Sequence, residues 1–125
     1  MKTVIDSDIF IDYLRSYPLS KRFFEELEPG KVLFSAVTEA ELLSGKDCND
    51  ETSMNETLRL LNAYTKIEVT NEIAKKAGEL RRVFGIQMQD AFIAATAMLN
   101  NAKLATRNVR DFQRIKGLMI QKPYG

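Results

Sequence analysis

Short apolar runs alternate with helix-forming segments along this chain, and this alternation limits the folds that it can adopt. Three of the runs read as buried strands: Thr3-Val4-Ile5, Val32-Leu33-Phe34 and Lys103-Leu104-Ala105. Strands that are apolar on both faces are typical of parallel sheets, because helices cover both sides of such sheets. We therefore expect an α/β fold, a three-layer α/β/α sandwich with a central parallel sheet and right-handed crossovers.

Capping residues, breakers and apolar spacing predict where the elements begin and end. We expect strands over residues 2–6, 32–35, 66–69, 104–106 and 118–120. We expect seven helices. The first begins at an Asp8 cap and stops before Pro18, the second spans 20–27, the third runs from a Thr38 cap through Leu43, and the fourth follows a Ser53–Glu56 capping box. The others run from Thr70 or Asn71 to Gly85, over 88–99 and over 108–115, and residues 46–52 are expected to form an exposed loop. The helix over 88–99 is apolar nearly all round, which predicts burial, and Asp90 is its one charge.

Length and composition limit the classes of protein. The 125 residues suit a single domain over 1–125, and no apolar run approaches the roughly 18 residues of a membrane span. Asp6 comes too early for the apolar core of a secretory signal, and Cys48 is the only cysteine, so we expect a cytoplasmic protein. The chain has no histidine. This excludes a histidine general base and the Ser-His-Asp triad, and it leaves Cys48 without the usual activating partner.

The net charge of +1 hides an asymmetry. Residues 1–72 carry a net charge of −6, whereas residues 73–125 carry +7. An acidic half and a basic half suit a site in which carboxylates that hold a metal lie beside a surface that binds phosphate. The basic residues of 75–82 are also explained as the solvated face of one helix, whereas Arg107, Arg110, Arg114 and Lys116 flank a candidate site residue.

Four acids, Asp6, Glu41, Asp90 and Asp111, lie where an apolar run gives way to the start of a helix. In an open parallel sheet the carboxyl ends of the strands meet at one crevice. Two carboxylates about 4 Å apart repel by roughly 4 kcal/mol at an effective dielectric constant near 20. If the acids converge there, a hard divalent cation is the simplest way to offset their charge.

Each acid also has a structural explanation. Glu41 follows Thr38, and Asp111 follows Asn108, at the three-residue spacing of a capping box, and Asp8 can be a plain N-cap. Asp6 at the end of a central strand and Asp90 in an apolar helix are harder to explain in this way, because burial of an unpartnered carboxylate is costly. The joint pattern favours a functional site.

Four segments resemble the motifs of PIN-domain ribonucleases, particularly the VapC-type toxins. They are Val4-Ile5-Asp6-Ser7-Asp8-Ile9-Phe10-Ile11-Asp12, Ser35-Ala36-Val37-Thr38-Glu39-Ala40-Glu41-Leu42, Asp90-Ala91-Phe92-Ile93-Ala94-Ala95-Thr96-Ala97 and Thr106-Arg107-Asn108-Val109-Arg110-Asp111-Phe112. The resemblance spans nearly the whole chain, and the order and spacing of the segments agree with it.

The resemblance implies a metal-dependent endoribonuclease that uses Mg²⁺ or Mn²⁺. It implies that Asp6 and Asp90 are the chief metal ligands and that Glu41 is a third acid that holds the metal or its water. Asn108 stands where many relatives carry an acid, so Asp111 is assigned the fourth acidic role, with Asn108 as a further candidate ligand. Asp8 departs from the Asn, Ser or Thr common in its place, and either adds charge to the site or caps a helix.

The resemblance also implies an RNA substrate cut to leave a 5′-phosphate and a 3′-hydroxyl, a cognate antitoxin that binds near the aromatic-rich early helices, and a homodimer. Two alternatives remain. One is a binding module that keeps the fold without catalysis. The other is a phosphatase that uses Asp6 of the Asp6-Ser7-Asp8 run as a covalent nucleophile, although Phe10 does not suit that motif.

Overall fold

Five parallel strands form the centre of the computed structural model, which describes residues 1–125. The strands are β1 (Thr3–Ile5), β2 (Val32–Ser35), β3 (Thr65–Ile67), β4 (Lys103–Ala105) and β5 (Ile120–Gln121), in the order β3-β2-β1-β4-β5. The helices are α1 (Ser7–Leu14), α2 (Pro18–Glu25), α3 (Ala36–Leu43), α4 (Glu51–Asn62), α5 (Asn71–Phe84), α6 (Met88–Leu99) and α7 (Val109–Phe112), with short 3-10 helices at Pro29–Lys31 and Lys46–Asn49. No helix has the length and apolar character needed to cross a membrane.

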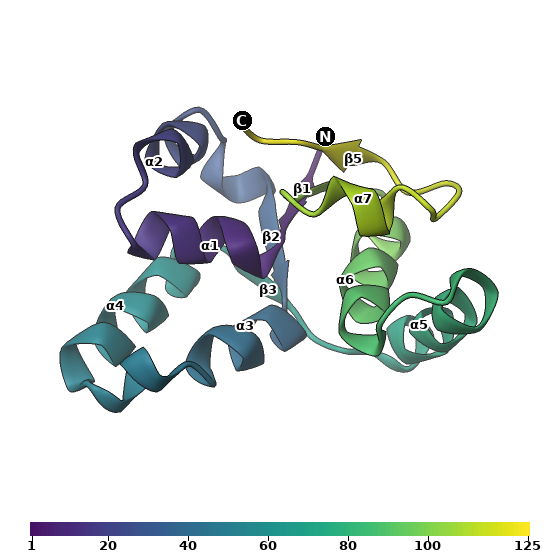
Figure 1. Ribbon diagram of the computed structural model, residues 1–125, viewed down its shortest axis with the longest axis horizontal. Helices are drawn as coiled ribbons and strands as arrows, with labels where there is room; N and C mark the ends of the chain where they lie inside the picture. The colour runs from purple at the N-terminus through teal and green to yellow at the C-terminus, as the bar shows by residue number, and fades with distance from the viewer.

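Helices cover both faces of the sheet, as the apolar strands predict (Figure 1). Successive strand residues point to opposite faces, so β1 sends Val4 into one core and Ile5 into the other. The first core lies under α5, α6 and α7, and the second lies under α1 to α4. The expected three-layer α/β/α sandwich is confirmed.

The strand order creates a crevice beside β1. The chain passes from β1 outward to β2 and β3, and then returns to the other side of β1 to form β4. The first connection therefore runs to one side of β1, and the connection from β3 to β4 runs back to the other side. This reversal of direction opens a crevice at the carboxyl ends of β1 and β4. Ile5 pairs with Ala105, so the next residues of the two strands, Asp6 and Thr106, lie side by side at the crevice.

Several predicted helix starts were wrong, because the residue that ends a strand or loop is itself the cap. Asp6, not Asp8, caps α1, and Ser35, not Thr38, caps α3 by accepting a hydrogen bond from the backbone N of Val37. Asp50 caps α4 in the same way, so Ser53 lies inside that helix and does not begin a capping box.

Other observed element boundaries differ from the predicted boundaries by a few residues. Pro18 begins α2 instead of only ending α1, because the fixed φ of proline suits the first turn of a helix. The segment 46–52 contains a 3-10 helix and the start of α4. The strand predicted over 66–69 is Thr65–Ile67, the strand over 118–120 is Ile120–Gln121, and the helix over 108–115 is only Val109–Phe112.

Two glycines, one within α5 and one at its C-terminal cap, offer a test of how local conformation sets the stability of this helix. Gly85 ends α5 in the left-handed region with φ of 67°, whereas Gly78 lies within the helix, and neither has another atom within 4 Å of where a Cβ would be. We expect Gly85→Ala to lower the free energy of unfolding by about 1 kcal/mol, because a side chain disfavours this conformation. We expect Gly78→Ala to raise it by about 0.5 to 1 kcal/mol, because alanine has the higher helix propensity. Urea unfolding of both variants measures the two signs, and a stabilising Gly85→Ala would contradict the assignment of the cap.

Candidate active site

Asp6 lies at the centre of the crevice and is only 7% exposed. Its backbone N donates to the carbonyl of Ala105, which continues the β1–β4 ladder by one residue. Its Oδ1 accepts from the backbone N of Ser7 at 2.8 Å, and its Oδ2 accepts from the Thr106 hydroxyl at 2.7 Å. Burial raises the pKa of Asp6, while the hydrogen bonds from Thr106 and Ser7 lower it. The carboxylate is therefore fixed in orientation by both neighbouring segments.

Thr106 was not predicted as a site residue. It is fully buried, and its Oγ1 donates to Asp6 and accepts from the backbone N of Asn108 at 2.9 Å. One sequence signal was available, since Thr106 follows the β4 run as Asp6 follows the β1 run. The threonine thus connects the ends of two strands and starts the turn into α7.

Glu41 reaches the same crevice from α3. It is half-buried, and its Oε2 accepts from the Ser7 hydroxyl at 3.1 Å. Burial, and then the charges of Asp6 and Asp90, raise its pKa, while hydrogen bonds from Ser7 and Gln89 lower it. The capping explanation for Glu41 is wrong, because Thr38 does not cap α3.

Asp90 lies in the first turn of α6, at the positive end of the helix dipole. Burial raises its pKa most, followed by the charges of Asp6 and Asp111. The pKa of Asp90 therefore responds to the acid that follows β1 and to another acid from α7. No ion pair in the structure includes Asp6, Glu41 or Asp90.

Asp111 lies at the edge of this group, on the short helix α7, and is exposed. Its Oδ2 accepts from Nδ2 of Asn108 at 3.1 Å. This bond joins two side chains, and Asn108 makes no side-chain cap, so the pair is not a capping box. The Asn108 amide thus holds one oxygen of the Asp111 carboxylate.

Asp8 faces the loop after β4 instead of capping a helix. Its Oδ2 accepts from the backbone N of Arg107 at 3.1 Å, while its Oδ1 is buried without a hydrogen-bond partner. Burial, and then the charge of Asp6, raise the pKa of Asp8 from 3.8 to about 7. Asp8 therefore lies close enough to Asp6 for the two negative charges to repel each other.

The carboxylates of the crevice are suitable ligands for a hard cation, but they do not surround a complete metal site. Asp6, Glu41 and Asp90 supply carboxylate oxygens, the ligands that Mg²⁺ and Mn²⁺ prefer, and they have no basic side chain to offset their charge. No three acids are spaced to hold one ion between them. Mg²⁺ is commonly held by one or two carboxylates and keeps several waters, so this spacing suits an ion that is partly hydrated.

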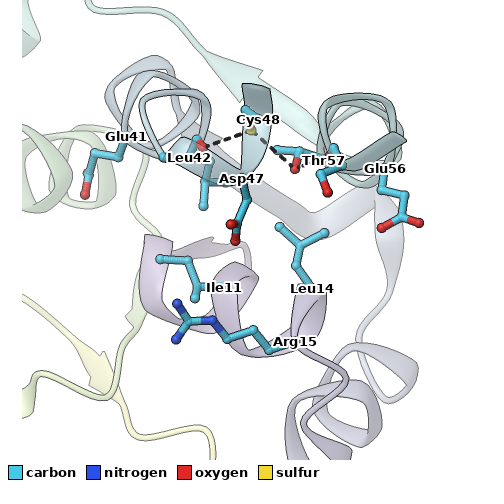
Figure 2. A pocket seen from close by; sticks show the side chains of 11 residues that line it. Ile11, Leu14, Arg15, Glu41, Leu42, Asp47, Cys48, Glu56 and Thr57 are labelled. Atoms are coloured by element: carbon cyan, nitrogen blue, oxygen red, sulfur yellow. Dashed lines mark hydrogen bonds between the residues drawn. The ribbon is translucent and has the colours of Figure 1, made fainter. Parts of the chain in front are cut away.

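A pocket of about 190 Å³ adjoins Glu41 and lies between α1, α3 and α4. The pocket is lined by α1, by α3, by the 3-10 helix after α3, and by α4 (Figure 2). Glu41 stands at its edge, and Asp47 extends toward its interior. The Cys48 thiol contacts the carbonyl of Leu42 and the hydroxyl of Thr57. Cys48 therefore packs in the wall of this pocket and does not join the acids.

A family model defines the class of this protein. Residues 3–118 match the PIN domain, a span that contains β1 to β4, all four acidic motifs and Thr106. The chain therefore belongs to the PIN-domain family.

Curated relatives place it more closely. The chain is 33% identical over 128 residues to ribonuclease VapC19 of Mycobacterium tuberculosis, covering 97% of this chain and 98% of that protein. It is 31% identical over 121 residues to ribonuclease VapC10 of the same organism, covering 92% and 89%. These relatives place the chain in the VapC group of PIN-domain proteins.

Solved structures share the fold over nearly the full length. A chain of a toxin–antitoxin complex from Klebsiella pneumoniae has a TM-score of 0.86 and 28% identity, with 98% of each chain covered. A chain of VapBC-1 from nontypeable Haemophilus influenzae has a TM-score of 0.82 and 26% identity, again with 98% of each chain covered. The expected PIN-like fold is confirmed.

The raised pKa values predict an unusual dependence of stability on pH. The pKa values of Asp6, Glu41, Asp90 and Asp8 all lie above their ordinary values, so the native state binds more protons than the unfolded state between about pH 4 and pH 7. Stability must then fall as the pH rises through this window, and no histidine is present to oppose the effect. We expect the Tm in EDTA to be at least about 3 °C higher near pH 5.5 than near pH 8.

Asp8→Asn is the matched variant for this measurement, because it removes the carboxyl whose pKa is raised to about 7. Thermal unfolding of the variant should show a smaller difference in Tm between the two pH values. A metal-free protein that is equally stable or more stable near pH 8 would contradict the raised pKa values of these acids.

Proposed function

We propose that this protein is the toxin of a VapBC-type toxin–antitoxin pair and a metal-dependent endoribonuclease. The supporting relatives are described as ribonucleases, and a relative from Shigella flexneri that is 28% identical is described as a tRNA(fMet)-specific endonuclease. The observation that carries the proposal is the group formed by Asp6, Glu41 and Asp90. At the switch point of the sheet, the charge of Asp6 raises the pKa of both Glu41 and Asp90, in addition to the larger effect of burial. None of the three acids forms an ion pair.

Asp6 and Asp90 are the proposed chief ligands of a Mg²⁺ or Mn²⁺ ion, with Glu41 as a third acid and with Asp111 and Asn108 at the periphery. When bound, such an ion lowers the pKa of a water and offsets the negative charge that develops on a phosphodiester during in-line attack. Water is thus the proposed nucleophile, which agrees with a chain that has no histidine.

The residues around the acids have their own parts in this scheme. Thr106 and the backbone of Ser7 fix both oxygens of Asp6, and the Ser7 hydroxyl orients Glu41. Rigid orientation matters because a carboxylate that rotates freely loses entropy when it binds an ion. The proposed products, a 5′-phosphate and a 3′-hydroxyl, follow from attack by water without participation of the 2′-hydroxyl, and the proposed location is the cytoplasm, with the RNA.

The geometry does not favour the phosphatase alternative. Hydrogen bonds to both oxygens of Asp6 make its carboxylate a poor nucleophile, whereas each oxygen keeps a second lone pair that can bind a metal ion. The second aspartate of that motif should act as acid and base, yet one oxygen of Asp8 holds the backbone of Arg107 and the other is buried. The catalytically silent binding module remains the second candidate.

The proposed antitoxin site runs along α1 and α4. A pocket of about 380 Å³ there is lined by Tyr13, Leu14, Leu60 and Tyr64, and the Lys21 ammonium lies 5.6 Å from the ring centre of Tyr13. It shares Leu14 and Glu56 with the pocket beside Glu41. A bound segment that follows both pockets would therefore pass toward the active site. The protein is also proposed to be a homodimer.

Not all of the early aromatic residues are available to a partner. Phe10, Phe23 and Phe24 belong to the core, and the ring centres of Phe10 and Phe24 are 5.5 Å apart. Tyr13 and Tyr64 are only partly buried against that core. The aromatic part of the proposed partner surface is therefore smaller than the sequence indicates.

Asp90→Asn is the first test of catalysis. We expect at least a hundredfold slower cleavage of labelled tRNA and rRNA in Mg²⁺ or Mn²⁺, because a proposed ligand is lost, and no cleavage by the natural protein in EDTA. Asp90→Asn should not unfold the protein, because it removes a repulsive charge without removing a hydrogen bond that the structure shows.

Asp6→Asn is also expected to abolish cleavage, but its amide must face either Ser7 N or the Thr106 hydroxyl, so its Tm needs checking. Glu79→Gln, an exposed position on α5, is the control, and full activity of Asp90→Asn would refute the assignment.

Expression in bacteria separates the toxin from the silent binding module. We expect growth arrest when the natural chain is induced, loss of arrest with Asp90→Asn, and relief by the protein encoded next to it. The readout is the growth rate, with immunoblots to show equal amounts of both variants. Growth arrest that persists undiminished with Asp90→Asn would favour action through binding alone.

A further inference from the structure

Arg107 is fixed beside the acidic crevice by contacts from two aspartates of α1. Its backbone N donates to Oδ2 of Asp8 at 3.1 Å, and its Nε lies 3.1 Å from Oδ2 of Asp12 and 4.0 Å from Oδ2 of Asp8. Its neighbour Thr106 holds Asp6. The base of this side chain is therefore placed by the same turn that places the central acid.

The outer end of the guanidinium is free. Neither Nη of Arg107 makes a hydrogen bond with the protein, and the side chain is 49% exposed. The planar guanidinium presents its donors as a rigid fork that matches the oxygens of a phosphate. Asp12 therefore occupies one edge of the fork, at Nε, and leaves the Nη donors to a ligand.

A tyrosine near the C-terminus holds Asp12 in turn. The Tyr124 hydroxyl donates to Oδ2 of Asp12 at 2.7 Å, and Asp12 is only 14% exposed. The ring of Tyr124 packs edge to face with Tyr17 and Phe23 at centre distances of 5.5 and 6.4 Å. The carboxylate that orients Arg107 thus has little freedom to move.

No other basic side chain near the crevice is both held in place by carboxylates and left with free donors. Lys31, Lys66 and Lys76 pair with glutamates outside the acidic group, and Arg81 donates to the carbonyl of Ile86. Arg110, Arg114 and Lys116 make no ion pair that would fix them. Of the basic residues near the crevice, Arg107 alone is oriented by the protein.

We propose that Arg107 binds a backbone phosphate of the RNA next to the scissile bond, and that Asp12 and Tyr124 are its positioning residues. The inference rests on the proposed function. A polyanion that approaches Asp6, Glu41 and Asp90 meets repulsion, and an oriented cation at the rim lowers that repulsion and sets the register of the strand.

The test measures RNA binding without catalysis. A short fluorescein-labelled single-stranded RNA is titrated with the Asp90→Asn protein in EDTA, and anisotropy gives Kd over a series of salt concentrations. Adding Arg107→Gln should raise Kd about tenfold at low salt, because a charge-assisted contact is lost. It should also make the slope of log Kd against log salt shallower by about 0.7, the value for one phosphate contact on a single strand.

Three further variants separate binding from structure. Arg107→Lys keeps the charge and should restore most of the salt slope. Tyr124→Phe removes only the hydroxyl that holds Asp12, so it should weaken binding a few-fold and leave the slope unchanged. Lys31→Gln removes one positive charge just before β2, at the opposite end of the strands, and should change neither quantity. The Tm of every variant shows that it is folded.

The outcomes distinguish this inference from the function on which it rests. If the Asp90→Asn protein binds RNA and Arg107→Gln changes neither Kd nor the salt slope, the role of Arg107 is refuted while the ribonuclease assignment stands. If the Asp90→Asn protein binds no RNA at low salt, either in EDTA or with Mg²⁺ added, both the proposed function and the role of Arg107 are refuted. A tighter-binding, fully folded Arg107→Gln variant also overturns the inference.

Discussion

The hydrogen bond between Thr106 and Asp6 is the contact on which the rest of the crevice depends. It joins residues 100 positions apart, each of them the first residue after a buried strand. The register that pairs Ile5 with Ala105 brings them together, and the burial of both keeps water from competing for the bond. Asp6 then caps α1 and fixes the turn that carries Ser7 and Asp8, so one contact sets the position of three polar residues.

Much of the fold could be predicted from sequence, because its signals are local. The apolar run Val32–Ser35 is a strand with the expected bounds, and α5 and α6 begin and end where Thr70, Gly85 and the apolar stretch 88–99 place them. Helix starts were less accurate. Asp6 and Ser35 each end a strand and cap the following helix, and no spacing rule shows that the intervening loop has zero length.

The candidate site was predictable only in part, because only some of its residues carry a local sequence signal. A carboxylate at a strand end or in an apolar helix is visible in the sequence, so Asp6 and Asp90 could be singled out. The roles of Thr106 and Ser7 depend on partners that lie far away in the chain or across the crevice, and a buried hydroxyl has no distinct sequence signal. The basic half of the chain was interpreted as a general phosphate-binding surface, yet only contacts with Asp8 and Asp12 distinguish Arg107 from its basic neighbours.

The central position of β1 has a consequence for synthesis of the protein on the ribosome. Strand β1 is made first, but its neighbour on one side, β4, is made about a hundred residues later. Until β4 emerges, the growing chain has neither Thr106 to hold Asp6 nor the second wall of the crevice. A half-translated chain therefore has its first acids but no assembled crevice, so the site cannot form until β4 has been made.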